Sequence, residues 1–186
     1  TYIDMSILTK SQFATIAQTK AGYKGLSGVL NENRQFSRST QLTSVFLSHS
    51  HLDKDVVEQA VSFFRNFGIA VYVDWADKTM PEKPNGETAQ NIKNQIIVND
   101  KFVLLATNNA ITSKWCNWEV GIGDTYKFKN KNIALLPLAD NSGTWNGNEY
   151  LQIYPRIEQG STYKNDYYVW YPDGTLENIT DWLKRK

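Results

Sequence analysis

The chain has 186 residues, 41% of them hydrophobic and 13% aromatic, which is enough apolar material for the core of one domain. Its 20 basic and 19 acidic residues leave a net charge of +1, so nothing in the charge balance favours nucleic acid as a partner. No apolar run approaches the ~20 residues of a membrane-spanning helix, and the single cysteine, Cys116, cannot form an internal disulfide. We therefore expect a cytoplasmic protein without a membrane or nucleic-acid partner.

The N-terminal stretch differs in pattern from the rest. Residues 11–25 have the spacing of a helix, with Ser11 as a possible N-cap and Gly22 as a possible end. The polar residues 35–43 follow and are typical of a linker. We therefore expect a short N-terminal helical extension over residues 1–42 and the main domain over residues 43–186.

In the main domain, short apolar runs alternate with segments of helical periodicity. The runs are typical of buried parallel strands and cover residues 44–50, 69–75, 101–107, 132–138 and 167–172. The helical segments cover residues 53–68, 87–98, 113–128 and 175–186, and residues 139–164 are predicted to be a loop. Strands that alternate with helices form right-handed βαβ units. This predicts a flavodoxin-like α/β fold, an open five-stranded parallel sheet with helices on both faces.

The fold predicts where a ligand would bind. In open parallel sheets, ligands bind beyond the carboxyl ends of the strands, near the switch in strand order. The residues that follow the first three predicted strands are therefore candidates: Ser48, His49, Ser50, Asp74, Trp75, Asp77 in the next loop, and Thr107–Asn109. The two aspartates are also typical turn and cap residues after a strand, so their pattern alone is not specific.

One carboxylate, Glu119, stands in an aromatic stretch close to this edge. It follows Trp115 by four residues, so the two share a face of the predicted helix. A carboxylate there can hydrogen-bond the hydroxyls of a ribose and stabilise a developing oxocarbenium ion, while the indole offers a stacking surface. An amphipathic helix can also carry such a pair at the edge of its core, with the carboxylate reaching water. The residues alone leave both interpretations open.

Other kinds of active site find little support in the sequence. His49 and His51 lie beside serines, but there is no G-x-S-x-G motif, and neighbouring residues at a strand end point in different directions. Two histidines and one distant cysteine lack the spacing of metal ligands, so no metal is predicted. The chain also lacks both common glycine-rich phosphate loops.

The order of motifs from Ser44 to Leu138 resembles the Toll/interleukin-1 receptor (TIR) domain family. "SVFLSHSHLDKD" is similar to the first conserved box of that family. "PNGETAQNIKNQIIVNDKFVLLATNNAITSKWCNWEVG" resembles the region from the loop after the second strand to the S-x-W-C-x-x-E motif. The residues of that motif in this chain are Ser113, Trp115, Cys116 and Glu119.

The resemblance implies an enzyme that breaks the bond between nicotinamide and ribose in NAD+. Glu119 would be the catalytic residue and Trp115 would stack on the substrate. The pocket would be lined by Ser48, His49 and Ser50 together with Asp74 and Trp75. NAD+ would be the substrate, with no separate cofactor, and the product would be ADP-ribose or a cyclic ADP-ribose isomer.

The resemblance also implies partners. In catalytic members of the family, two neighbouring chains complete the pocket, so we expect self-association through the loop 75–86. A stand-alone chain would make a diffusible signal read by a separate effector protein, as in bacterial anti-phage immunity. Two alternatives stay open: a non-catalytic TIR module that signals by assembly alone, and a nucleoside-transferring enzyme on the same kind of sheet.

Overall fold

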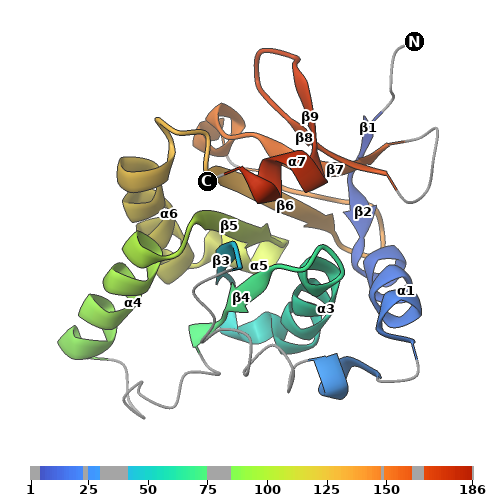
Figure 1. Cartoon of the computed structure of the whole chain (residues 1–186), viewed down its shortest axis with the longest axis horizontal. Helices are drawn as coiled ribbons and strands as arrows, with labels where there is room; N and C mark the ends of the chain where they lie inside the picture. Colours follow the sequence, from blue (N-terminus) through green and yellow to red (C-terminus); the bar gives the residue numbers. More distant parts are fainter. Residues whose placement is uncertain are drawn as a thin grey trace.

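The computed structural model describes residues 5–22, 25–29, 42–74, 85–147, 149–160 and 166–185. Its centre is one sheet in which the main strands lie in the order β4-β3-β5-β6-β7-β8-β9 (Figure 1). These strands are β3 (Ser44–Ser48), β4 (Ala70–Tyr72), β5 (Lys101–Ala106), β6 (Ile133–Ala139), β7 (Arg156–Gly160), β8 (Tyr167–Trp170) and β9 (Leu176–Asn178). The first five in the spatial order, β4 to β7, are mutually parallel.

Helices cover both faces of this sheet. One face carries α1 (Lys10–Ala21), α3 (Lys54–Arg65) and α7 (Ile179–Lys184), whose buried side chains share one apolar core. The other face carries α4 (Gly86–Val98), α5 (Asn108–Thr112) and α6 (Lys114–Lys127) around a second core. The buried strand β3 serves both cores, with Val45 and Leu47 in the first and Phe46 in the second. The predicted flavodoxin-like α/β fold is thus confirmed.

The fifth parallel strand differs from the predicted one. It is β7, within residues 139–164 that the sequence predicted as a loop, and this stretch also holds the short helix η4 (Glu149–Ile153). The predicted strand 167–172 corresponds to β8, which is antiparallel to β7, and β9 is antiparallel to β8. The apolar pattern missed β7 because Arg156 and Glu158 form an ion pair at 2.8 Å in the strand, with the Glu158 side chain only 2% exposed. Pairing allows these two charges to lie in a strand whose glutamate is buried. In the sequence, however, charged residues at these positions are typical of a loop.

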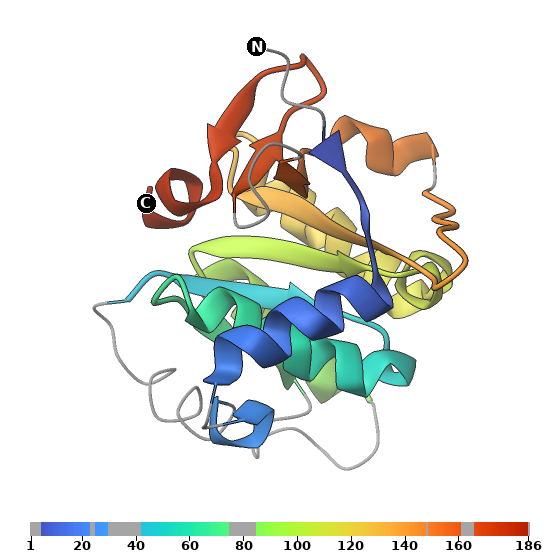
Figure 2. The same cartoon turned by 90° about the vertical axis from the view of Figure 1, so that its right-hand side faces the viewer.

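The described part of the N-terminal stretch joins the same sheet. Strand β1 (Met5–Ser6) pairs with β7, and β2 (Leu8–Thr9) pairs in parallel with β6. Helix α1 follows and lies beside α3 (Figure 2). Gly22 ends this helix as predicted, but its N-cap is Thr9, which forms a capping box with Gln12, and not Ser11. The division at residue 42 stays a prediction, because most of the predicted linker lies outside the described residues.

Helix α6 lies very close to the central strands because of a glycine. A Cβ added at Gly123 would lie 2.9 Å from the ring of Phe102 on β5, closer than real Cβ contacts allow. The buried residues of α6 (Cys116, Glu119, Val120, Gly123 and Lys127) recur at helical spacing. The packing of this stripe against the sheet fixes the rotation of α6 and turns Glu119 inward.

Candidate active site

Glu119 lies on helix α6, on the buried side of the sheet edge that the carboxyl ends of the parallel strands form (the carboxyl edge). The Ser113 hydroxyl caps the helix by accepting a hydrogen bond from the Cys116 amide at 3.3 Å. Glu119 itself is only 6% exposed. The alternative of an edge-of-core glutamate whose carboxylate simply reaches water therefore does not describe this residue.

The Glu119 carboxylate has a buried hydroxyl as its partner. Ser48, the last residue of β3, is 1% exposed and donates from its Oγ to Glu119 Oε2 at 2.5 Å. The pKa of the Glu119 carboxyl is raised to about 8, and burial is the main cause; the Ser48 hydrogen bond lowers the pKa in part and repulsion from Asp74 adds to the rise. A carboxyl whose pKa lies near neutral pH, at the edge where ligands bind, is a candidate for acid–base or electrostatic chemistry.

His49 and Asp74 bring the ends of two strands together beside this pair. His49 Nδ1 lies 2.9 Å from the carbonyl oxygen of Leu47, so this nitrogen carries a hydrogen and donates it. Nε2 of the same ring lies 3.3 Å from Asp74 Oδ1. The His49 side chain is 6% exposed and that of Asp74 is 36% exposed, so the aspartate faces the outer side of the pair. Both predicted residues therefore lie at the edge that holds Ser48 and Glu119.

Ser50 has a different position from the one expected for a pocket residue. It is buried, and its hydroxyl caps the short helix η2 (His51–Asp53) by accepting from the Leu52 amide at 3.3 Å. Its described contact thus shapes the turn after β3. Ser50 supports the loop that follows Ser48 and His49.

Trp115 lies at the surface between α4 and α6. The residue is 42% exposed, and its ring packs edge-on against Trp118, with ring centroids 5.3 Å apart. The two indoles line an open groove together with Ala89 and Lys114. Trp115 is therefore not a core residue, and its ring is available for stacking. The two other predicted residues, Trp75 and Asp77, lie outside the described residues.

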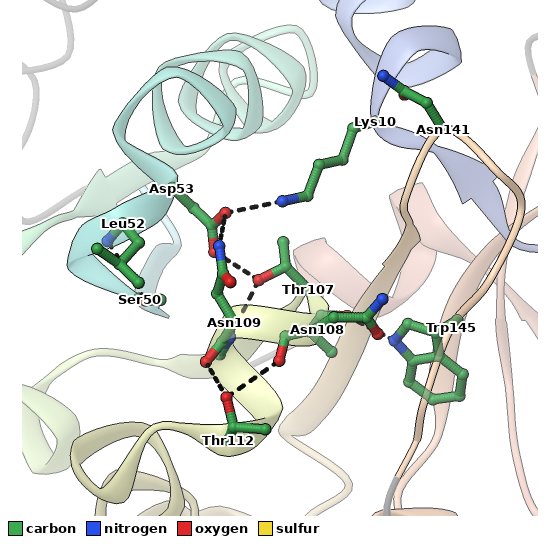
Figure 3. Close-up of polar contacts among 12 residues, drawn as sticks. Lys10, Ser50, Leu52, Asp53, Thr107, Asn108, Asn109, Thr112, Asn141 and Trp145 are labelled. Atoms are coloured by element: carbon green, nitrogen blue, oxygen red, sulfur yellow. Dashed lines mark hydrogen bonds and ion pairs between the residues drawn. The ribbon is translucent and has the colours of Figure 1, made fainter.

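A buried polar cluster at the same edge was not predicted as a unit. Asp53 is the N-cap residue of α3, but its carboxylate makes no capping bond. Instead it accepts from Thr107 Oγ1 at 2.5 Å, from Asn109 Nδ2 at 2.9 Å and from Lys10 Nζ at 2.8 Å (Figure 3). The strand-end rule pointed to Thr107 and Asn109. No sequence signal pointed to Lys10, which approaches from the N-terminal stretch.

In the described part of the chain, the histidine, cysteine, aspartate and glutamate side chains form no group of three or more that could hold a metal ion. None of the helices in that part of the chain is long and apolar enough to cross a membrane.

Comparisons with known proteins agree on one family. A family model described as "TIR domain" matches residues 45–158. The chain is 32% identical over 125 residues to the "Probable 3' cyclic ADP-D-ribose synthase ThsB'" of Bacillus cereus (strain MSX-D12), covering 65% of this chain and 63% of that protein. It is 25% identical over 108 residues to the "Putative cyclic ADP-D-ribose synthase TIR2" of Cytobacillus dafuensis, covering 56% of this chain and 28% of that protein. The chain thus spans less than two thirds of the length of each of these relatives.

Proposed function

Because the chain belongs to the TIR domain family, we propose that it cleaves NAD+ at the bond between nicotinamide and ribose. The observation that carries this proposal is the buried Glu119 carboxyl, held by Ser48 at the carboxyl edge of the sheet. A carboxyl in that place has no role in the apolar core. It suits a substrate on which positive charge develops during the reaction.

The chemistry follows from the leaving group. Nicotinamide departs from NAD+ as a neutral molecule, and the bonding electrons of the glycosidic bond leave with it. The ribose that remains has the character of an oxocarbenium cation. An ionised Glu119 beside the ribose stabilises that cation more than it stabilises the bound substrate, which is the condition for catalysis.

Ser48 has a positioning role in this mechanism. Its hydroxyl holds Oε2 of Glu119, which limits the directions in which Oε1 can point. The positive nicotinamide ring of the bound substrate also favours the ionised carboxyl, so substrate binding promotes loss of the Glu119 proton. Attack by water on C1′ gives ADP-ribose, nicotinamide and a proton. Attack by a hydroxyl or ring nitrogen of the same molecule gives a cyclic isomer, nicotinamide and a proton.

We propose the cyclic product because both curated relatives are named as cyclic ADP-D-ribose synthases. Cyclisation requires that water be kept from C1′ while the other end of the substrate reaches it. A cyclic nucleotide is a diffusible signal, and the family resemblance extends the proposal to a separate effector protein in anti-phage immunity.

Incubation with NAD+ and, separately, with adenosine tests the proposed function. Release of nicotinamide together with a product equal in mass to NAD+ minus nicotinamide supports cyclisation, and a product heavier by one water supports hydrolysis. Free adenine from adenosine, without nicotinamide from NAD+, would favour the nucleoside-transferring alternative. A protein that assembles but releases neither base would be a non-catalytic TIR module.

Replacement of Trp115 by alanine is expected to reduce NAD+ cleavage with little loss of stability. Base stacking on an aromatic ring contributes ~1–3 kcal/mol, so kcat/KM should fall about tenfold or more. Trp115 is 42% exposed, so the melting temperature should change far less than after removal of a core tryptophan. Tyr126→Ala is a matched control, since this residue lies on the same helix and is 46% exposed. A large fall in melting temperature with Trp115→Ala would assign the ring to packing instead.

Turnover per chain is expected to rise with protein concentration. This expectation rests on the proline-containing stretch 75–86, which the family resemblance connects with assembly. The stretch lies almost entirely outside the described residues. Head-to-tail contacts of one surface with a different one can extend into filaments. Specific activity and light scattering should therefore increase together over a hundredfold range of concentration, and substitution of Trp75 or Pro81 should weaken both. Constant specific activity from a monomeric protein would show that one chain is sufficient.

A further inference from the structure

The buried carboxylate of Asp53 has three donors, from two segments that are far apart in the sequence. Asp53 is 3% exposed and accepts from Lys10, the first residue of α1, from Thr107 after β5, and from Asn109 in α5 (Figure 3). Lys10 is the charged member of the set, and its side chain is 29% exposed. A buried carboxylate that loses its charged partner is strongly disfavoured, because neutral donors compensate its charge only in part.

The ion pair spans the carboxyl edge of the sheet. Lys10 follows Thr9, which lies opposite Ala139 at the end of β6, and the next residue, Ser11, donates to Asn141 Oδ1 at 2.6 Å. Asp53 follows β3. Strand β5 lies between β3 and β6, so the Lys10–Asp53 contact joins the two sides of the edge across the end of β5.

Asp53 is connected directly to the strand end that holds the proposed catalytic pair. Its amide donates to the carbonyl oxygen of Ser50 at 3.0 Å, which closes the turn that follows Ser48 and His49. Ser48 in turn holds Glu119. A continuous path of hydrogen bonds and short backbone therefore leads from Lys10 through Asp53 and the turn to the Glu119 carboxyl.

We propose that Lys10 is a positioning residue of the active site and acts through Asp53. This inference rests on the proposed function, since the geometry that Lys10 maintains is that of Ser48 and Glu119. Without the Lys10 charge, the Asp53 carboxylate becomes hydrated by moving outward. The turn 50–53 and the end of β3 are displaced with it. The N-terminal stretch is thus part of the catalytic edge and contributes to turnover although it touches no substrate.

Substitution of Lys10 by methionine tests this role. The methionine keeps most of the side-chain volume and removes the charge. Misplacement of a catalytic group by about 1 Å can cost ~10²-fold in rate, so we expect a loss of about tenfold or more in kcat with KM changed less than threefold. Lys10→Arg should restore most of the activity. Lys20→Met is the matched control: Lys20 lies at the other end of α1 and packs over the ring of Phe67, so it should leave kcat unchanged.

A double-mutant cycle separates positioning from general loss of stability. If Lys10 acts through Asp53, then Lys10→Met should have almost no further effect on kcat in an Asp53→Asn background. Additive losses in kcat, or a Lys10→Met protein with the kcat of wild type, would overturn the proposal.

Hydrogen exchange supplies a readout that needs no activity. The amides of the turn 50–53 should exchange at least fivefold faster in Lys10→Met than in Lys20→Met, while those of β5 stay protected in both. A wild-type protein that leaves NAD+ intact would contradict the proposed function, and the exchange result would still decide the role of Lys10. Equal exchange of the turn in the two variants would contradict that role.

Discussion

A Glu119→Gln variant is expected to fold normally and to release at least ~10²–10³-fold less nicotinamide from NAD+ than the wild type, the usual cost of losing one electrostatic group at a reacting centre. The amide has the shape of the carboxyl but cannot carry its negative charge, so it cannot stabilise the ribosyl cation. The fold should tolerate it, because the raised pKa of Glu119, about 8, means that the native protein holds this carboxyl mainly in its neutral form at pH 7. An amide is close to that neutral form in size and polarity.

The matched control for this variant is Glu58→Gln. Glu58 lies on α3, which covers the opposite face of the sheet from α6, and the same chemical change there should leave turnover as in the wild type. Thermal melts of both variants should lie within a few degrees of the wild type. A folded Glu119→Gln protein with near-normal turnover would remove Glu119 from the mechanism.

The second large effect is expected in the pH dependence. In the proposed mechanism the ionised form of Glu119 is the active one, and the pKa of this carboxyl is raised to about 8 in the free protein, mainly by burial. Below that pKa, the ionised fraction falls tenfold for each pH unit. The value of kcat/KM, which reports the free protein, should therefore rise about tenfold from pH 6 to 7 and about fivefold from pH 7 to 8, and level off above. An ordinary glutamate, whose pKa is about 4.3, would be fully ionised over this range and would give a flat profile.

Two comparisons make the pH prediction specific to Glu119. The profile of kcat should have its midpoint at lower pH than that of kcat/KM, because the positive nicotinamide ring favours the carboxylate in the complex. In a Ser48→Ala variant the kcat/KM profile should move to higher pH, because the hydroxyl that lowers the pKa of Glu119 is gone. A wild-type profile that is flat between pH 6 and 9, or a Ser48→Ala profile with an unchanged midpoint, would contradict the assignment.

The parallel sheet and the position of Glu119 could be predicted because local pattern determines them. Residues 44–48 form a short apolar run whose side chains are buried on both faces of the sheet. Such a run is typical of a central parallel strand. Glu119 could be placed because helical spacing relates it to Trp115 and because α6 starts close to the end of β5. These features depend on neighbours in the sequence.

The features that were missed depend on partners far away in the sequence. Strand β7 is stabilised by an ion pair within the strand and by pairing with β6, neither of which gives an apolar alternation. The contact of Lys10 with Asp53 joins residues 43 positions apart, and the pairing of β2 with β6 and the packing of α1 beside α3 bring them together. The capping role of Ser50 was missed for a local reason instead, because the sequence did not predict the short helix η2.

The most direct test of NAD+ cleavage through Glu119 is the number of nicotinamide molecules that each chain releases from NAD+. The purified protein, at a concentration high enough for self-association and at pH 8, is incubated with excess NAD+, and nicotinamide is quantified over time beside the Glu119→Gln variant. We expect many equivalents of nicotinamide per wild-type chain and almost none from the variant. Intact NAD+ after prolonged incubation with an assembled wild-type protein, or equal release by the two proteins, would contradict this expectation.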